Sequence, residues 1–449
     1  MKNLLKKKDF AEAGALYFIA TLFNKGIGFV TVPIFSRILT TSDYGTVTTF
    51  NSWVSMISVF ISLALYNAVR NSFVDMDDKE RPHFLSTIIT FTGLVFLTVM
   101  GVCVVATVFV PRNINTALIF MCIIQSFGYA LINDYSYYLM MRYRYKFRAA
   151  LMVLPGLISV VLSIFAILFI LKDNLYLGRI VPTTAVYGIF AIVVLMAVYS
   201  KTKPELNLDY LKYGLKIALP LVLHSIALQI LSQSDRVMIT SLRNAAETGV
   251  YSLVYNLSMI ATVITTSLDG IWVPWFTGKL KERKIREINV LAMDYVHLMT
   301  YAMVALILVG PEILKIFADQ RYWEGMSIIP PIALANYMIF MYTMYVYIEH
   351  YYKKTVYITK NTLIAAGLNV ILNFILIPKY GYVAAAYTTL ASYFVAFILH
   401  SRYAKKIEPD IYPLKMFALP LLHVGGAIIL YYPLLNFWTL ASYDSVLFF

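Results

Sequence analysis

Apolar stretches of about 20 residues alternate with short polar stretches along almost the whole chain. As helices, stretches of this length cross a bilayer hydrocarbon core of roughly 30 Å. The pattern predicts thirteen membrane-spanning segments: 13–38, 45–69, 84–110, 115–141, 149–171, 177–199, 214–240, 249–276, 290–317, 327–351, 357–377, 382–401 and 416–436. We expect an all-α polytopic membrane protein in which twelve segments form the core and the last is an accessory helix.

The composition agrees with this pattern. Hydrophobic residues make up 60% of the chain and charged residues 14%, whereas a soluble domain carries about 25% charged residues. The mean hydropathy is +0.71. Cys103 and Cys122 each fall inside a predicted helix, and we interpret them as small packed apolar groups. The composition excludes a soluble domain, and no disulfide framework is predicted.

The formal net charge of +13 follows a topological pattern. Lys and Arg gather in the N-terminal segment and in every second loop, for example at 142–148, 201–216 and 279–286, and they are few in the loops between. Because basic loops stay in the cytoplasm, we predict a multi-pass protein whose N-terminus is cytoplasmic. This pattern explains the charge, so no nucleic-acid partner is predicted.

The two halves of the chain resemble each other. Three pairs of stretches match at an offset of about 200 residues: 36–47 with 235–251, 133–146 with 342–354, and 183–187 with 388–393. Six segments per half is an even number, so both halves start on the same side of the membrane. We expect two parallel-repeat six-helix lobes around a central cavity, as in transporters that bind substrate between their halves. The predicted lobes are residues 1–200 and 201–405, followed by an accessory membrane segment at 406–449.

Three runs of residues resemble a known family. They are Pro33-x-x-Ser36-Arg37-x-Leu39-Thr40-x-x-Asp43-Tyr44-Gly45, Asp235-Arg236-x-Met238-Ile239 followed by Gly249-Val250-Tyr251-Ser252, and Asn369-x-x-Leu372-Asn373-x-x-Leu376-Ile377-Pro378-Lys379-Tyr380-Gly381 followed by Ala384-Ala385-Ala386. The runs are similar to the polysaccharide transporter (Wzx-type oligosaccharide flippase) branch of the multidrug/oligosaccharidyl-lipid/polysaccharide exporter superfamily. The resemblance covers most of residues 10–405.

This resemblance implies a function in cell-surface polysaccharide assembly, such as O-antigen or capsule export. A flippase of this kind moves polyprenyl-diphosphate-linked oligosaccharide from the cytoplasmic to the outer leaflet of the bacterial plasma (inner) membrane by alternating access. The resemblance also implies coupling to an H+ or Na+ gradient, with no other cofactor. The implied partners are the lipid-linked glycan, membrane lipids, and polysaccharide polymerases or glycosyltransferases. Within the superfamily, a cation-coupled multidrug exporter (an antiporter) and a lipid II flippase are the alternatives.

Lys25 lies at the centre of the apolar segment 13–38. A lysine at the middle of a membrane helix costs about 2.5 to 3.5 kcal/mol, so it should face a polar cavity or a charged partner. Under the family resemblance, Lys25 contacts the diphosphate of the substrate, with Asn24 beside it. The alternative is that Lys25 neutralises a buried acid, such as Asp134 or Asp269, for packing alone.

Four other charged residues in or near the predicted spans are candidates for function. Arg37 and Arg236 lie at equivalent positions of the repeat, at the outer ends of their segments. Either could receive the diphosphate as it emerges, and snorkelling to the interface explains them as well. Asp134 and Asp269 are carboxylates inside predicted spans, which makes them candidates for carrying a coupling proton or binding sodium.

The chain contains 35 tyrosines. Tyr337, Tyr345 and Glu349 are spaced by multiples of four along one predicted segment, which puts them near one helix face. Aromatic faces with hydroxyls suit sugar rings, so Tyr345 is a candidate substrate contact, although helix packing accounts for many tyrosines in membrane proteins. Glu349 is close to the cytoplasmic end of its segment and is expected at the membrane interface.

Enzymatic activity is not expected. The sequence has no Gly-x-x-x-x-Gly-Lys-Ser/Thr loop, and its six histidines lack the spacing of metal ligands. The strongest enzymatic alternative is a membrane-embedded polysaccharide polymerase or ligase. Such enzymes usually place catalytic residues in a long extracytoplasmic loop, and the loops predicted on that side are short. We therefore predict a transporter without catalytic residues or a bound metal.

Overall fold

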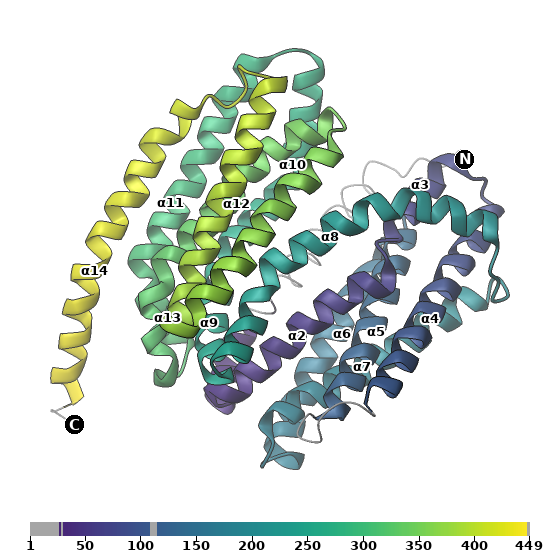
Figure 1. The fold of residues 1–449 in the computed structure, drawn as a ribbon, viewed down its shortest axis with the longest axis horizontal. Coiled ribbons are helices and arrows are strands. Elements are labelled where there is room, and N and C mark those ends of the chain that lie inside the picture. Colours follow the sequence, from purple (N-terminus) through teal and green to yellow (C-terminus); the bar gives the residue numbers. More distant parts are fainter. Residues whose placement is uncertain (1–26, 28–29, 108–114, 447–449) are drawn as a thin grey trace. The chain divides into compact units, whose positions relative to one another are not determined.

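The computed structural model describes residues 27, 30–107 and 115–446 of the chain. These residues form helices joined by short turns, and no strand occurs among them (Figure 1). Eleven helices in this part of the chain are long and apolar enough to cross a membrane. The expected all-α polytopic membrane fold is confirmed.

The helices fall into two compact units. The first consists of Met1–Thr31 and Ile38–Val237, and the second of Val32–Arg37 and Met238–Phe449, as far as these residues are described. The boundary lies inside the long helix α8. The lobes predicted from the repeat, with a boundary at residue 200, stay a prediction.

The first unit contains the helices α2 to α7 and most of α8. Their bounds are α2 Thr41–Ser62, α3 Tyr66–Asp75, α4 Glu80–Ala106, α5 Thr116–Met141, α6 Tyr145–Phe165 with a π-helical turn η1 at Ala166–Ile170, α7 Leu175–Tyr199 and α8 Leu208–Leu242. The helix α5 is central, because it contacts α2, α3, α4, α6 and α7.

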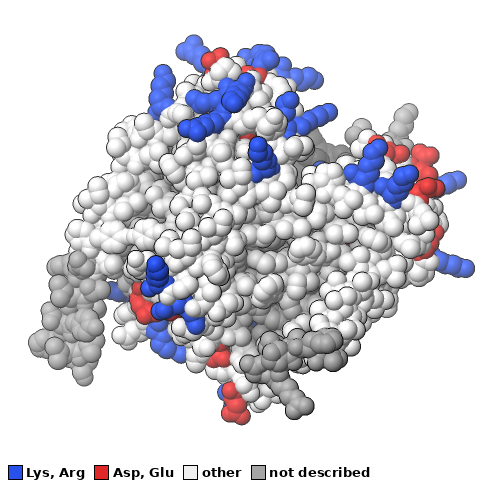
Figure 2. All heavy atoms as spheres, viewed as in Figure 1, with Lys and Arg blue, Asp and Glu red and all other residues white. Residues whose placement is uncertain are grey.

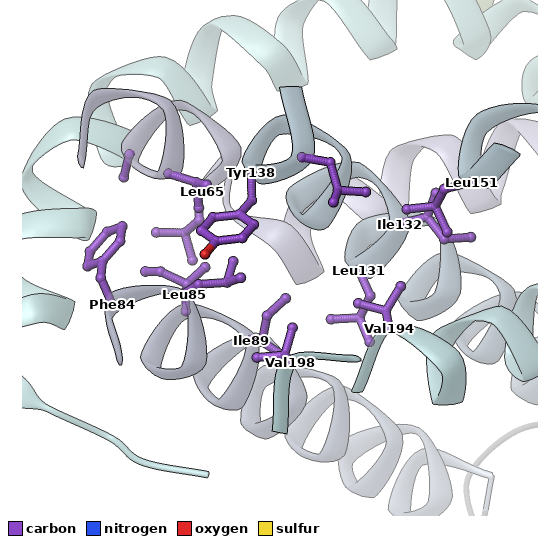
Figure 3. Packing of buried hydrophobic residues seen from close by; sticks show 14 of the residues in the cluster. Leu65, Phe84, Leu85, Ile89, Leu131, Ile132, Tyr138, Leu151, Val194 and Val198 are labelled. Carbon is purple, nitrogen blue, oxygen red and sulfur yellow. The ribbon is translucent and has the colours of Figure 1, made fainter. Parts of the chain in front are cut away.

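The core of the first unit lies around α5. Leu65 before α3, Ile89 of α4, Leu131 of α5 and Val194 of α7 are buried in one hydrophobic cluster (Figure 3). Between helices that face lipid there is no hydrophobic driving force, so these side chains stabilise the unit by close van der Waals packing. The cluster therefore fixes the helices that surround α5.

The second unit contains the remaining helices. Their bounds are α9 Ala245–Ser258, α10 Ile260–Lys281, α11 Ile285–Phe317, η2 Gln320–Ile328, α12 Ile329–Tyr351, α13 Thr355–Ile407, η3 Leu414–Phe417 and α14 Ala418–Val446. Here α12 is central, with contacts to α9, α10, α11, α13 and α14. The helices α5 and α12 carry the two tyrosine-rich stretches that the internal repeat aligns.

The predicted segments can be compared with the observed helices. Segment 13–38 lies largely outside the described residues. Segments 357–377 and 382–401 are two helices that share the label α13 and meet at a kink, with non-helical torsion angles at Gly381. Segments 45–69 and 249–276 are each broken into two helices, α2–α3 and α9–α10. Each of these two broken segments is the second membrane-spanning segment in its half of the chain.

Few charged side chains lie in the middles of the helices. On the face drawn in Figure 2, Lys and Arg gather toward the edges of the view, with a broad uncharged surface between them. Large apolar side chains such as Leu97, Val161 and Ile189 are exposed on the first unit. Exposed apolar surface of this extent is what helices that face lipid require.

Candidate functional site: a polar cavity at a helix break

The break between α2 and α3 has an unusual backbone. Leu63 and Ala64 have positive φ angles of 44° and 53°. A non-glycine residue in this left-handed region costs about 1 to 2 kcal/mol. Ser62 stabilises the break locally, because its hydroxyl accepts a hydrogen bond from the Ala64 amide (3.2 Å) and its carbonyl accepts one from the Leu65 amide (2.9 Å). Backbone strain of this kind is found at functional sites, where the surrounding structure holds it in place.

A polar cavity of about 270 Å³ lies against this break, inside the first unit. It is lined by Ser58, Val59, Ser62, Ala64, Tyr66, Tyr129, Ala130, Asn133, Tyr137, Ser225, Leu228 and Gln229. These residues come from α2, the start of α3, α5 and α8. Irregular backbone at membrane depth is tolerated only where protein buries it or where it lines a cavity that holds water. The cavity thus explains why the break is possible.

Aromatic and basic groups meet at one side of the cavity. The rings of Tyr66 and Tyr137 are stacked, with their centroids 4.8 Å apart. Arg70 of α3 and Arg148 of α6 are near enough to the Tyr137 hydroxyl to interact with it electrostatically. Arg148 also donates a hydrogen bond from Nε to the Ser136 hydroxyl (3.1 Å). Stacked tyrosines beside guanidinium groups can bind a sugar ring next to a phosphate.

Asp134 lies on α5 next to Asn133, which lines the cavity. Its side chain is fully buried, and the backbone amide of Tyr66 at the start of α3 lies near its carboxyl group. Neither carboxyl oxygen has a hydrogen-bond partner among the described residues. A buried carboxyl group without a partner is costly when it is charged, so Asp134 is suited to bind a proton or a small cation.

Polar side chains also connect the helices around the cavity. The Gln125 amide of α5 donates to the Asn51 side chain of α2 (3.5 Å) and accepts from the Thr184 hydroxyl of α7 (3.2 Å). The Ser52 hydroxyl of α2 donates to the side-chain oxygen of Gln233 on α8 (3.0 Å). These bonds hold α2 in register with α5, α7 and α8, and so they position the break.

The structure describes some of the predicted substrate contacts, each in its own surroundings. Asn24 and Lys25 lie outside the described residues. Arg37 is exposed and donates to the Ile316 carbonyl (3.0 Å), at the end of α11 in the second unit. Arg236 is buried in α8 and donates to the Ser232 carbonyl (2.9 Å) of its own helix.

Two further candidate residues lie in the second unit. Tyr345 is fully buried, and its hydroxyl donates to the Tyr412 carbonyl (2.7 Å). This contact gives Tyr345 a packing role between α12 and the turn before α14. Asp269 of α10 accepts a hydrogen bond from the Tyr347 hydroxyl. Its carboxyl group therefore has a hydrogen-bond partner, whereas that of Asp134 has none within the part of the chain that the structure describes.

Four cavity residues, Tyr66, Asn133, Tyr137 and Gln229, were not predicted from the sequence. The sequence does contain a sign of a polar site, because α2 is rich in serine and threonine and the stretch from Asn133 is rich in tyrosine. At the sequence level, however, the internal repeat is enough to explain the tyrosine-rich stretch. A break at Leu63 and Ala64 gives no signal, since neither glycine nor proline occurs there.

A second buried polar cluster lies in α13 of the second unit. The Asn373 amide donates to the Asn369 side chain (3.1 Å), the Thr388 hydroxyl donates to the Asn373 side chain, and the Ser392 hydroxyl donates to the Thr388 carbonyl (2.7 Å). Asn369 and Asn373 belong to one of the runs that carry the family resemblance. The cluster ties the two halves of α13 together on either side of Gly381.

Comparison with known proteins decides the family. The model of the family "Polysaccharide biosynthesis protein" matches residues 10–278, more than half of the chain. The chain belongs to this family. A protein of the Lsg locus of Haemophilus influenzae is 20% identical over 285 residues, which span 60% of this chain and 66% of that protein.

Solved structures show that this member of the polysaccharide biosynthesis family has a transporter fold. The lipid II flippase MurJ in an inward closed conformation matches with a TM-score of 0.66 and 16% identity, over 93% of this chain and 92% of that one. A mutant of the Vibrio cholerae MATE transporter VcmN matches with a TM-score of 0.59 and 12% identity, over 90% of this chain and 99% of that one. At these identities the likeness concerns the fold alone.

Proposed function

We propose that this protein is a flippase that moves polyprenyl-diphosphate-linked oligosaccharide from the cytoplasmic to the outer leaflet of the bacterial inner membrane. The observation that carries the proposal is the polar, tyrosine-lined cavity at the α2–α3 break of a membrane-spanning unit. Membership of the polysaccharide biosynthesis family and the transporter fold support it. Alternating access between the lobes 1–200 and 201–405 is part of the same proposal.

The chemistry of the cavity suits a sugar in transit. Leaving water for an apolar slab costs several kcal/mol for each polar group that finds no new hydrogen bond. Hydroxyls and amides such as Ser62, Asn133 and Gln229 can replace the water around a sugar. A cavity of about 270 Å³ is at the small end of ligand pockets, so it receives one sugar-sized group at a time and not a whole oligosaccharide.

The diphosphate needs cationic partners. Arg70 and Arg148 lie beside the tyrosine pair at the cavity, and guanidinium groups bind phosphate through paired hydrogen bonds. Lys25, with Asn24, remains our proposed contact in the middle of the membrane, where the lysine supplies a compact point charge. Arg37 and Arg236 are proposed contacts at exit.

Coupling to an H+ or Na+ gradient supplies the direction of transport in this proposal. Asp134 is the stronger of the two proposed coupling residues, because its carboxyl group is buried without a hydrogen-bond partner among the described residues. Asp269 is the second. Polysaccharide polymerases or glycosyltransferases, which elongate or consume the transported glycan, are the proposed protein partners.

Complementation of a bacterial strain that lacks its own oligosaccharide flippase tests this function. Wild type and Lys25→Arg should restore surface polysaccharide, whereas Lys25→Ala should not, because a cation is required. Asn133→Leu should lower the surface polysaccharide at least tenfold, since it removes the amide and fills the cavity. Thr98→Ala is the matched control, because Thr98 is exposed on α4 and its hydroxyl bonds only to its own helix (2.9 Å).

In this experiment, immunoblots of membrane fractions measure the level of each variant, and surface polysaccharide is compared at equal protein levels. Full activity of Asn133→Leu would remove the cavity from the transport path, and full activity of Lys25→Ala would remove the role of Lys25. The wild type could fail to restore surface polysaccharide with several glycan substrates and yet rescue a strain depleted of lipid II flippase. That result would replace the proposed substrate by lipid II.

A further inference from the structure

A buried acid and a buried imidazole meet in the second unit. Glu349 of α12 and His400 of α13 are both fully buried, and Nδ1 of His400 lies 2.8 Å from a carboxyl oxygen of Glu349. Glu349, which is expected near the membrane interface, is enclosed by protein. The residues are 51 positions apart in the chain, and only the packing of α12 against α13 brings them together.

The pair is incompletely satisfied. The second carboxyl oxygen of Glu349 and Nε2 of His400 are buried, and neither has a hydrogen-bond partner among the described residues. A buried ion pair that serves stability alone needs further hydrogen bonds to offset the loss of water. Two buried polar atoms without a protein partner are a feature of groups whose protonation changes.

Charge counting shows how many protons the pair holds. With one proton shared between them, Glu349 and His400 have no net charge, as imidazolium and carboxylate or as imidazole and carboxylic acid. Removing that proton leaves one negative charge in a buried site, and adding a second leaves one positive charge. Both are costly. The pair therefore exchanges one proton between its neutral state and a state with one net charge, and a change of pH or of the surroundings of the pair shifts this exchange.

The neighbours of the pair favour proton exchange. The Tyr342 ring is stacked on the His400 ring, with centroids 5.5 Å apart, which is within the range where an aromatic ring stabilises a cation. His350, the residue after Glu349, is exposed and interacts electrostatically with His400. Tyr403 of α13 interacts with Glu349 in the same way. An exposed imidazole beside a buried one offers a route for a proton to and from the predicted cytoplasmic side.

We propose that Glu349 and His400 form a proton-binding site that takes up and releases one proton during each transport cycle. This inference rests on the proposed function, because it assigns the site to the coupling of transport. A proton enters at Nε2 of His400, with the exposed His350 as its source, and the proton on Nδ1 passes to the Glu349 carboxylate. Release to the opposite side of the membrane follows when the alternation of the lobes changes the surroundings of the pair, which returns to imidazole and carboxylate, so no other reactant is needed. The site is additional to Asp134 and Asp269.

The first test measures proton binding without any substrate. Infrared difference spectra of the purified full chain in lipid, recorded between about pH 5 and about pH 8, should show a buried carboxyl group and an imidazole that change protonation. The signal should vanish in Glu349→Gln and in His400→Gln. It should persist in Glu282→Gln and in His423→Gln, which alter exposed residues. Wild-type spectra without such a signal would overturn the proposal, even if every variant failed to fold.

The second test measures use of the site in transport. The double variant Glu349→Gln with His400→Gln keeps an amide pair that can form a hydrogen bond but cannot titrate. It should reach the membrane at wild-type level and lose at least tenfold in surface polysaccharide in the complementation strain. Wild-type transport by the double variant would overturn the coupling role. Failure of wild type itself to complement would overturn the proposed function, and the infrared signal would still decide whether the proton site exists.

Discussion

Two glycines in α13 differ in backbone conformation and in the space around them. Gly381 has a φ of +62°, and a Cβ added there would lie 2.4 Å from a carboxyl oxygen of Glu247. That carboxylate also accepts hydrogen bonds from the Tyr382 amide (3.0 Å) and from Arg243 (3.0 Å). Gly367 has ordinary helical torsion angles, and no atom lies within 4 Å of an added Cβ. The two positions therefore form a matched pair for substitution.

Gly381→Ala should destabilise the protein by about 1 to 3 kcal/mol, because it adds backbone strain and displaces Glu247. Gly367→Ala should stabilise it by about 0.5 to 1 kcal/mol, since alanine loses less entropy in a helix than glycine does. Thermal unfolding of both variants in detergent, followed by tryptophan fluorescence, measures the difference. Equal unfolding temperatures for the two variants would contradict the strained conformation at Gly381.

Asp319, between α11 and η2, provides a prediction for pH. A hydrogen bond from the Arg321 side chain (2.8 Å) and one from the Arg321 amide lower the pKa of the Asp319 carboxyl below its usual value of 3.8. The stability from this contact is therefore present above pH 3.8 and is lost as the pH falls through the lower pKa of the folded state.

Asp319→Asn should accordingly lower the unfolding temperature slightly at neutral pH and have no effect in strong acid. The side chains of Asp319 and Arg321 are 33% and 44% exposed, so the effect belongs to the range of about 0.2 to 1 kcal/mol for exposed pairs. Unfolding curves over a series of pH values, with the exposed Asp173→Asn as control, measure it. If the difference in unfolding temperature between wild type and Asp319→Asn grew toward low pH, the assigned contact between Asp319 and Arg321 would be wrong.

At the scale of elements, the break between α2 and α3 decides the shape of the cavity. Ala64→Gly should stabilise the protein by up to about 1 kcal/mol, because glycine adopts positive φ freely. Ala64→Val should destabilise it by more than about 2 kcal/mol, since a β-branched residue is strongly disfavoured there. Ala106→Val, at an exposed position with ordinary torsion angles in α4, should cost less than about 0.7 kcal/mol. Chemical unfolding of the three variants tests this order, and a tolerated valine at position 64 would contradict the break.

The sequence predicts where helices lie better than how they are interrupted. Hydropathy averages over a whole span, so segments 45–69 and 249–276 look continuous although each contains a break. The predicted gap between segments 357–377 and 382–401 coincides with the non-helical torsion angles at Gly381. At Leu63 and Ala64 neither glycine nor proline occurs, and contacts with other helices determine the torsion angles.

At the scale of the whole molecule, composition and family membership follow from the sequence, while the site depends on tertiary contacts. The tyrosines and arginines around the cavity come from α3, α5 and α6, and the amide of Gln229 comes from α8. Likewise, Glu349 and His400 belong to different helices. No local pattern predicts which polar residues of separate spans will face each other. The division of the chain into lobes at residue 200 is still to be tested, and so is the role of Lys25.

The walls of the cavity are synthesised at different times. The break at Ala64 leaves the ribosome before α5, and Gln229 of α8 follows the break by 165 residues, from 229 − 64. At about 5 to 20 residues per second, the interval is roughly 8 to 33 s. During this time the polar backbone of the break has no finished cavity to cover it, and lipid cannot satisfy it. Biogenesis therefore requires the membrane insertion machinery to shelter the interrupted α2–α3 segment until α8 has arrived.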